Sequence, residues 1–574
     1  MIQELVEFGK RVTQNRNMAF CEEAYSLVLV IDKEGNFQSF RPIEGVVNTA
    51  LVTEHNNSNK KPKGVITAKQ GHARFLLDKS AEVLGIGGNA IKKHNIFMQV
   101  LERYRDVQAL KPVFAFYEIN KKNGLIKAIA EFDKLENKPK DANITFMVGS
   151  ILLLNNEEVK DAIIKLYEND EKRLNTGKIC SICGTSDSPV LDEPHGMVKM
   201  PQGQKAGSAL ISYNEKAFES YGLEGNLNSS ICRSCARNYI EGLSFLLSDG
   251  YMMEDKDKKK SHFHYNHRIK ISDTTVALFW TKYEMNEINP FMIYEEPDES
   301  EVRNLFDSVW NGDYRIGKII ETNMFYSCTL SSAAARIAVR DWTAISLDDY
   351  KRNLADWFRD IGIEDYNGKL TYSPLGLLIN ASQRDRKSGE SSKSDLNSKA
   401  RIGSILWNAA IKGRSYKIPI ETLQYVLNRI CMRGDFSAYR AAIIKLIINR
   451  NTNKNMKSGL DEDNRSVAYL CGRLFAVIES MQWKAMGNVN NGIKERFFAA
   501  AVSQPAYILG TLLTKNVPIY QHKIGGYLAK ELNEIAGIIS ESGSFPQRFT
   551  PLEQGEFALG YYFQKTHKSN SEKS

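Results

Sequence analysis

The chain has 574 residues, of which 42% are hydrophobic and 25% are charged, and its formal net charge is +8. These values are typical of a soluble globular protein with about three to four domains. They exclude a membrane-spanning protein, because no apolar run approaches the roughly 20 residues that a spanning helix needs. The N-terminus carries Glu4 and Glu7 where a signal peptide would be apolar, so we expect a cytoplasmic protein with reduced thiols.

Short strands and helices alternate over the first 150 residues. The run YSLVLVIDKEGNFQSFRPI, residues 25–43, holds two β-rich stretches around a turn at Asp32–Gly35, and this pattern predicts a hairpin. Helices are expected at 90–107 and 156–174, with a strand-like run, ANITFMVGSILLL, between them at 142–154. This order predicts an α+β domain.

The polar segment 56–74, NNSNKKPKGVITAKQGHAR, is a candidate DNA-binding loop. Its lysines and arginine can neutralise phosphates, and its amide side chains can contact base edges in a groove. An ordinary surface loop has the same composition, so this alternative stays open. The candidate residues are Asn59, Lys60, Lys61, Lys63, Lys69, Gln70 and Arg74.

Four of the eight cysteines form two C-x2-C pairs, Cys180 with Cys183 and Cys232 with Cys235. A tight turn at this spacing lets two thiolates reach one tetrahedral ion. In a reducing compartment such pairs favour zinc over disulfides. Four thiolates leave the ion no open position, so we expect a structural zinc that staples an inserted lobe and activates nothing.

Inside this lobe, residues 195–222 are rich in Gly, Lys and small polar side chains. Such a segment can place backbone N–H groups and the cations Lys199 and Lys205 along a phosphate chain. A plain surface loop is the alternative.

Three histidines, His262, His264 and His267, precede the buried strand predicted at TTVALFW, residues 274–280. The first two share one face of an extended strand, so a second metal site is conceivable. The alternative is the polar start of a strand, since the nearby sequence offers no obvious carboxylate to orient an imidazole. As catalytic ligands, these histidines would make the protein a zinc-dependent nuclease.

The segment NASQRDRKSGESSKSDLNSKA, residues 380–400, is nearly free of apolar residues and predicts a flexible linker. Beyond it, apolar residues recur at spacings of three and four, as in 461–487, DEDNRSVAYLCGRLFAVIESMQWKAMG. Further helices are expected at 490–502, 505–513, 523–539 and 551–567, which together predict a helical bundle.

The start of this helical region is basic. Between Lys412 and Lys454 it has nine Lys and Arg residues against only Glu421 and Asp435. Such a bias is typical of a surface facing phosphates, although a solvated helix face explains it equally well. The candidate DNA-binding residues here are Arg414, Arg433 and Arg440.

Enzymatic signatures are scarce. A zinc deaminase needs H-x-E before P-C-x-x-C, but Ile179 and Ile231 precede the two pairs. The sequence also has no Walker loop, HExxH or G-x-S-x-G motif. We therefore expect a protein that is not an enzyme.

Several longer motifs resemble the large subunit of type I-C CRISPR Cascade, the Csd family. They span essentially the whole chain and occur in the family's order. They are SALISYNEKAFESYG (208–222), SDTTVALFW (272–280), SPLGLLINAS (373–382), GRLFAVIESMQ (472–482), IKERFFAAAVSQPA (493–506) and LEQGEFALGYYFQ (552–564).

The resemblance implies a non-catalytic, Cas8-like subunit of an RNA-guided surveillance complex. It implies reading of the short protospacer-adjacent motif (PAM) in double-stranded DNA, help with duplex unwinding into an R-loop, and contact with the displaced strand. The implied partners are the crRNA-bound backbone, crRNA-processing and small subunits, and a recruited helicase-nuclease that degrades the DNA. The second cysteine pair is not part of the resemblance, so zinc depends on the spacing alone.

The resemblance also implies that the C-terminal bundle matches the small subunit of other Cascades and can be made separately from an internal start. Met456 is our first candidate for that start and Met432 the second; either can be an ordinary internal residue.

The fold class expected is α+β, with a mixed N-terminal domain, an inserted zinc-stapled lobe and an all-α C-terminal bundle. The expected boundaries are 1–175, 176–245 for the zinc-ribbon-like lobe, 246–380 for the continued α+β domain, 381–400 for the linker and 401–574. The leading hypothesis is a DNA-recognition subunit. A zinc-dependent nucleic-acid enzyme and a bare scaffold are the alternatives.

Overall fold

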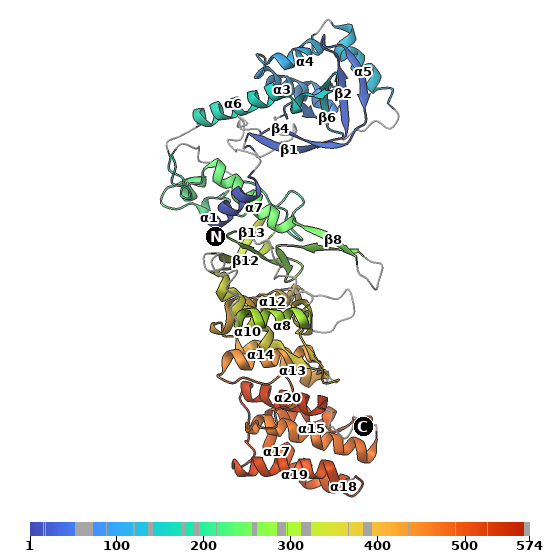
Figure 1. Ribbon diagram of the computed structural model, residues 1–574, viewed down its shortest axis with the longest axis vertical. Coiled ribbons are helices and arrows are strands. Elements are labelled where there is room, and N and C mark those ends of the chain that lie inside the picture. Colours follow the sequence, from blue (N-terminus) through green and yellow to red (C-terminus); the bar gives the residue numbers. More distant parts are fainter. Residues whose placement is uncertain are drawn as a thin grey trace. The chain divides into compact units, whose positions relative to one another are not determined.

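The computed structural model describes most of the chain (Figure 1). The described residues are 1–14, 17, 19–51, 73–87, 89–118, 121–135, 142–174, 178–186, 195–213, 215–254, 261–283, 294, 297–310, 323–333, 335–365, 367–382, 393–433, 436–487, 489–524 and 526–567.

The chain forms two compact units. The first contains Met1–Phe245 and Ala333–Ile337, and the second contains Leu246–Ser332 and Ala338–Ser574. Phe245 is also the predicted end of the cysteine lobe, whereas no division between units falls near residue 175. The five-part domain division made from the sequence stays a prediction.

A small mixed sheet forms the core of the first unit. Its strand order is β3-β2-β6-β5, and β7 pairs with β6. The hairpin predicted around Gly35 is confirmed, because β2 and β3 pair antiparallel on either side of it. Gly35 has φ +78°, and a Cβ there would lie 2.5 Å from the carbonyl oxygen of Pro112, so only glycine fits this turn. The strands are β2 (Leu27–Ile31), β3 (Phe37–Arg41), β5 (Leu77–Asp78), β6 (Ile144–Val148) and β7 (Ile151–Leu152).

Helices lie against this sheet and bury an aromatic core (Figure 1). Phe97 and Phe116, from two different helices, both contact Phe146 of β6 at ring-centroid distances of 6.5 and 6.2 Å. The helices predicted at 90–107 and 156–174 are confirmed. The helices are α2 (Ser80–Val83), α3 (Ala90–Glu102), α4 (Lys111–Phe116), α5 (Lys127–Phe132) and α6 (Glu157–Leu174).

A separate two-stranded ribbon, β1 (Phe20–Tyr25) with β4 (Gly45–Ala50), belongs to the same unit. Helix α1 (Ile2–Val12) packs on α7 (Arg233–Ser248) so closely that a Cβ at Gly9 would lie 1.9 Å from the carbonyl oxygen of Asn238. Backbone therefore meets backbone where the N-terminal helix crosses the helix that follows the second cysteine pair.

The second unit contains an antiparallel sheet with strand order β10-β11-β12-β13. The predicted strand TTVALFW is confirmed as β11, and Phe279 from its inner face packs on Trp407. The strands are β8 (Gly250–Glu254), β9 (Ser261–Tyr265), β10 (Arg268–Lys270), β11 (Thr275–Thr281), β12 (Met324–Ala333), β13 (Arg336–Ser346), β14 (Ile363–Glu364) and β15 (Leu370–Thr371).

The rest of the second unit is helical, which confirms the predicted helical C-terminal region. Part of the predicted linker is helical too, because α12 begins at Lys393; residues 383–392 lie outside the described part of the chain. The helices are α8 (Glu299–Trp310), α10 (Leu347–Ile361), α11 (Leu375–Ala381), α12 (Lys393–Lys412), α13 (Ile420–Arg433), α14 (Ala438–Asn451), α15 (Val467–Met486), α16 (Ile493–Ser503), α17 (Pro505–Thr511), α18 (Val517–Gln521), α19 (Gly526–Glu541) and α20 (Pro551–Thr566).

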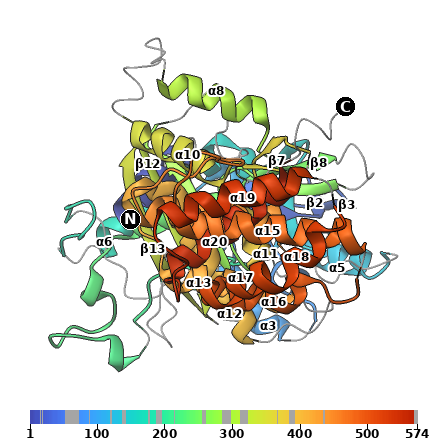
Figure 2. The ribbon, with the colours of Figure 1, turned by 90° about the horizontal axis from the view of Figure 1, so that it is seen from below.

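Helices α15 and α20 form the centre of this region, and α13, α14, α16 and α19 pack around them (Figure 2). Each helix has a glycine at the contact: a Cβ at Gly472 would lie 1.9 Å from the Phe557 carbonyl oxygen, and one at Gly560 would lie 2.1 Å from that of Tyr469. These glycines belong to the GRLF and LGYY motifs of the sequence. Their role is therefore to let two helix backbones touch.

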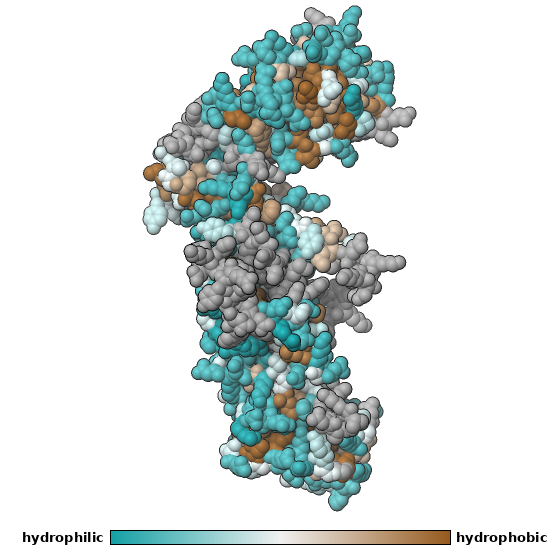
Figure 3. All heavy atoms as spheres, in the orientation of Figure 1, coloured by the Kyte–Doolittle hydropathy of each residue, from teal (hydrophilic) through white to brown (hydrophobic). Residues whose placement is uncertain are grey.

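Short helical turns complete the fold at Gln108–Leu110, Lys122–Ile126, Leu153–Asn155, Lys216–Phe218, Gly225–Ser229, Gly413–Ser415 and Leu512–Asn516. Hydrophilic side chains cover most of the face drawn in Figure 3, with smaller apolar patches between them. Among the described helices, none has both the length and the apolar character to cross a membrane.

Candidate metal centre and nucleic-acid interface

The four paired cysteines come together in the first unit. One ligand atom from each of Cys180, Cys183, Cys232 and Cys235 lies within 4.8 Å of all the others. Three of the four side chains are buried, and only Cys183 is exposed. The 48 residues between the pairs thus start and end at one point, as the sequence predicted.

Local backbone geometry aims N–H groups at the sulfur atoms. The amides of Ile182 and Cys232 point at Cys180 Sγ, 3.4 and 3.3 Å away, and the amide of Cys235 points at Cys232 Sγ at 3.4 Å. Gly184, with φ +72°, closes the first turn by donating to the Cys180 carbonyl at 2.9 Å. Donors placed this way stabilise thiolates, which are the form of cysteine that binds metals.

The pKa shifts of the thiols also favour metal binding by this cluster. Hydrogen bonding by Cys235 lowers the pKa of Cys232 to about 5, and Cys232 immediately precedes the first turn of α7. The pKa of Cys235 is correspondingly raised by its hydrogen bond to Cys232. The thiolate form of Cys232 is thus favoured, and the thiolate is the form of cysteine that binds a metal. A divalent ion with affinity for sulfur fits this four-thiol set, and the cluster could bind one.

A short hairpin projects from the segment between the two pairs. Val198 and Ser208 exchange both backbone hydrogen bonds, at 2.9 and 2.8 Å. Gly207, with φ +97°, allows the return, because a Cβ there would lie 2.8 Å from Met197 Cβ. The tip exposes both predicted cations, Lys199 and Lys205, together with Gln202 and Gln204. We call residues 198–208 the lysine hairpin.

Most of the predicted DNA-binding loop, residues 56–74, lies outside the residues that the structure describes. Asn59, Lys60, Lys61, Lys63, Lys69 and Gln70 fall in residues 52–72, beyond the described residues. Arg74 is described, and its side chain is only 12% exposed. Its guanidinium lies 3.4 Å from Glu23 and 3.5 Å from Asp78, and burial raises the pKa of Asp78 to about 6. Arg74 therefore anchors the end of the segment, and its predicted DNA contact is untested.

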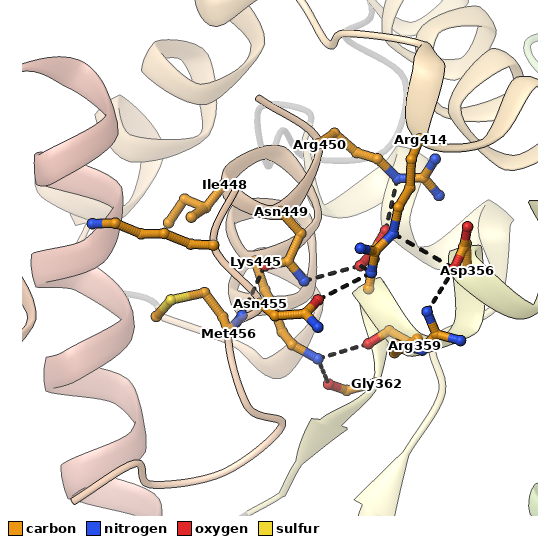
Figure 4. Close-up of polar contacts among 12 residues, drawn as sticks. Asp356, Arg359, Gly362, Arg414, Lys445, Ile448, Asn449, Arg450, Asn455 and Met456 are labelled. Carbon is orange, nitrogen blue, oxygen red and sulfur yellow. Dashed lines mark hydrogen bonds and ion pairs between the residues drawn. The ribbon is translucent and has the colours of Figure 1, made fainter. Parts of the chain in front are cut away.

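Part of the basic stretch 412–454 is internal, which the sequence did not indicate: Arg440, Lys445 and Arg450 are buried, whereas Arg414, Lys417 and Lys454 are exposed. Figure 4 shows the surroundings of Lys445 and Arg450. Asp360 is fully buried; it forms an ion pair with Arg450, whose Nε lies 2.7 Å from Oδ2, and accepts a hydrogen bond from Asn449 Nδ2 at 2.9 Å. Lys445 donates to the carbonyl oxygens of Arg359 and Gly362, both at 2.8 Å. These cations hold α10 and α14 together inside the second unit. We call this set the Asp360 network.

The individual DNA-binding candidates of this stretch differ. Arg414 is 40% exposed and lies 3.5 Å from both Asp356 and Asp360. Arg440 is 3% exposed and donates to the Ala381 carbonyl at 3.1 Å. Arg433 ends α13, and its side chain is outside the described part. DNA contacts by these residues are untested, but burial of Arg440 argues against one there.

Of the three histidines, the structure describes the side chains of His264 and His267, and neither belongs to a group of three or more potential metal ligands. His264 is 6% exposed, and its ring centroid is 5.2 Å from that of Tyr251. His267 Nε2 lies 3.6 Å from an oxygen of Asp249, so the expectation that no carboxylate orients an imidazole here was wrong. The side chain of His262 is outside the described residues. Within the described part, the four cysteines are the one group of three or more potential ligands.

The two candidate start methionines have different environments. Met432 is 78% exposed on α13, whereas Met456 is 8% exposed and its amide donates to Asn449 Oδ1 at 2.9 Å (Figure 4). Both α13 and α14 precede Met456 and pack on α20. A fragment starting at Met456 would uncover that side of α20; whether either start is used is untested.

Comparison with known families gives one match over nearly the whole chain. The family model for a CRISPR-associated protein, Cas_Csd1, matches residues 5–568. A search of curated proteins finds no match. The family match confirms the resemblance found in the sequence motifs, and the chain belongs to the Cas_Csd1 family of CRISPR-associated proteins.

Proposed function

We propose that this chain is the large subunit of a type I-C CRISPR surveillance complex, Cascade. In this role it recognises the protospacer-adjacent motif in double-stranded DNA, helps to open the duplex and recruits the helicase-nuclease. It assembles with the crRNA-bound backbone, processing and small subunits. The family match over residues 5–568 carries this proposal.

The lysine hairpin is our candidate for contact with the flanking duplex. Lys199 and Lys205 are exposed cations for phosphates, and Gln202 and Gln204 carry amides that can pair with base edges. The task suits a few side chains, because base pairing with the guide reads the rest of the target. Both lysines of the hairpin are exposed, unlike the buried Arg440 and Lys445 of the basic stretch 412–454.

We propose that the cysteine cluster binds Zn²⁺ through all four thiolates. The ion then has no position left for water or substrate, so it supplies structure and no reaction chemistry. Its effect is to fix residues 178–185 and 230–235 at the base of the segment that carries the lysine hairpin. Consistent with this, we propose that the subunit itself is not catalytic.

The test is a reconstitution. The chain is co-expressed with the neighbouring subunits and a guide, and fluorescence anisotropy measures binding of duplexes that differ only in the flanking motif, at one salt concentration. We expect tight binding only for one flank and only when the chain is present. A complex that forms without the chain and binds all flanks equally would remove the recognition role.

The chain purified alone tests the nuclease alternative. The purified chain is incubated with DNA and RNA in Mg²⁺, Mn²⁺ or Zn²⁺, with a His264→Ala variant alongside. We expect no cleavage by either protein. Cleavage by the native chain that is lost in His264→Ala would contradict a non-catalytic subunit.

A further inference from the structure

A pocket of about 450 Å³ lies in the first unit, between the β1–β4 ribbon and helices α6 and α7. Neither the metal cluster nor the lysine hairpin contributes to it. The residues that matter for its chemistry are Phe20, Glu22, Asn48, Lys160, Arg237 and Glu241. Its volume falls within the range of small-molecule sites, which is about 300–1,000 Å³.

The ribbon sets one wall of the pocket. Glu22 on β1 and Asn48 on β4 are direct cross-strand partners, so their side chains leave the ribbon on one face. Phe20 precedes Glu22 by two residues and therefore belongs to the same face of β1. An aromatic ring, a carboxylate and an amide are thus placed side by side. Both Glu22 and Asn48 are exposed to solvent.

Helix α7 makes the opposite wall rigid. Arg237 Nε donates to Glu241 Oε1 at 2.7 Å, one helical turn away, and its Nη2 donates to the Phe20 carbonyl oxygen. Arg237 is only 15% exposed and ties α7 to β1. Lys160 adds a second cation from α6, where it pairs with Glu157 at 2.7 Å. The walls are therefore held by contacts that exist without any ligand.

The charge of the pocket narrows the class of ligand. Lys160 is paired with Glu157 and Arg237 with Glu241, and Glu22 adds a further carboxylate, so a free phosphate is not favoured. A carboxylate and an amide beside an aromatic ring suit a flat group with hydrogen-bond donors on its edge. A nucleobase has this chemistry: its face stacks on an aromatic ring, and its edge pairs with carboxylates and amides.

Building on the proposed role in DNA recognition, we propose that this pocket receives a single nucleobase turned out of the opened DNA. The Glu22 carboxylate accepts from donors on the base edge, Asn48 pairs beside it, and Phe20 provides the stacking surface. Guanine presents two adjacent donors, N1–H and the exocyclic amine, to such a carboxylate. Thymine presents one N–H between two carbonyl oxygens, which a carboxylate repels, so guanine is accepted and thymine rejected.

The chain position of Asn48 agrees with this role. Strand β4 ends at Ala50, two residues before the segment 52–72 in which the sequence places most candidate DNA-contacting side chains. A base leaving DNA bound by that segment would therefore have a receiving site on the strand that leads into it. All the residues that line the pocket are among the described ones.

Saturation-transfer NMR with the full-length chain tests the pocket directly, using deoxyguanosine and thymidine as probes without phosphate. We expect binding of deoxyguanosine and none of thymidine. Asn48→Leu and Glu22→Gln should each weaken deoxyguanosine binding about tenfold, because the first removes the amide that pairs with the base edge and the second replaces the carboxylate that accepts from it. Matched controls, Val46→Leu on the same strand and Glu44→Gln just before it, should bind like the native chain.

The outcomes separate this proposal from the proposed function. Absence of deoxyguanosine binding, equal binding of thymidine, or unchanged binding by Asn48→Leu and Glu22→Gln would overturn the pocket, even if the assembled complex still selects one flanking motif. Conversely, selective deoxyguanosine binding that these two variants lose would support the pocket even if the assembled complex proved indifferent to the flank. Thermal unfolding of each variant shows whether a loss reflects misfolding.

Discussion

Two groups of cations in this protein look alike in the sequence and differ completely in the structure. Between Lys412 and Lys454, the cations of the Asp360 network are buried against carbonyl oxygens and a fully buried carboxylate. On the lysine hairpin, which belongs to the segment between the two cysteine pairs, Lys199 and Lys205 are exposed. Lys445 and Arg450 of the denser group thus stabilise the fold, whereas both lysines of the sparser group are exposed to solvent. Local charge density is therefore a poor guide to a nucleic-acid surface unless the partner of each cation is known.

The largest effect is expected at the cysteine cluster, where the segment that carries the lysine hairpin starts and ends. Cys232→Ser should reduce bound zinc from about one ion per chain to nearly none, because a structural site needs all four ligands. Zinc binding is worth on the order of 10 kcal/mol in small zinc domains, so the segment 185–230 should become sensitive to limited proteolysis. Metal content is read by mass spectrometry. Cys431→Ser, outside the cluster, is the control, and unchanged zinc in Cys232→Ser would rule out the four-thiolate site.

The next largest effect is expected on the free energy of unfolding, when the Asp360 network is broken. Asp360→Ala leaves Arg450 buried without its carboxylate, which should lower the free energy of unfolding by about 3–5 kcal/mol. All six tryptophans, from Trp280 to Trp483, belong to the second unit, so their fluorescence in urea reports this unit alone. Asp463→Asn, at an 89% exposed side chain, should change the same quantity by less than about 0.5 kcal/mol. Equal stability of the two variants would show that the Asp360 network does not hold the fold.

The burial of Lys445 also predicts that the stability of the protein depends on pH. Burial lowers the pKa of Lys445 to about 8, so between pH 8 and about 10.4 the unfolded chain binds a proton that the folded chain has lost. Stability contributed by this group therefore rises with pH, by about 1 kcal/mol from pH 7 to pH 9. Urea unfolding of the native chain and of Lys445→Met at both values isolates the difference. A gap between the two proteins that does not change with pH would mean that Lys445 keeps an ordinary pKa.

The smallest effect on stability is expected on the lysine hairpin. Replacing both Lys199 and Lys205 with glutamine should change the free energy of unfolding by no more than about 0.5 kcal/mol, because both side chains are exposed. Thermal unfolding of the double variant beside the native chain checks this. A large loss would mean that these lysines serve the fold, as Lys445 and Arg450 do.

Sequence patterns predicted what depends on neighbours along the chain. The hairpin at Gly35, the strand β11 and the helices after residue 400 follow from turn residues and apolar spacing, and the cysteine cluster from its C-x2-C pairs. The Asp360 network could not be predicted, because Asp360 and Arg450 are 90 positions apart and charge counts do not record partners. The pocket was missed for the same reason: Glu22, Asn48 and Arg237 meet only in the folded chain. The alternation that places Glu22 and Asn48 outward on two paired strands was the one available signal.

The salt dependence of DNA binding tests most directly whether the exposed cations, and not the dense basic stretch, meet DNA. The assembled complex is titrated with its flanked duplex at several salt concentrations, with the native chain, the Lys199/Lys205→Gln double variant and Lys412→Gln, whose native side chain pairs with Asp341 at 2.8 Å. Each phosphate contact contributes about 0.9 to the slope of log K against log salt, so the double variant should lose about 2 and Lys412→Gln nothing. A slope unchanged in the double variant but reduced in Lys412→Gln would contradict this account.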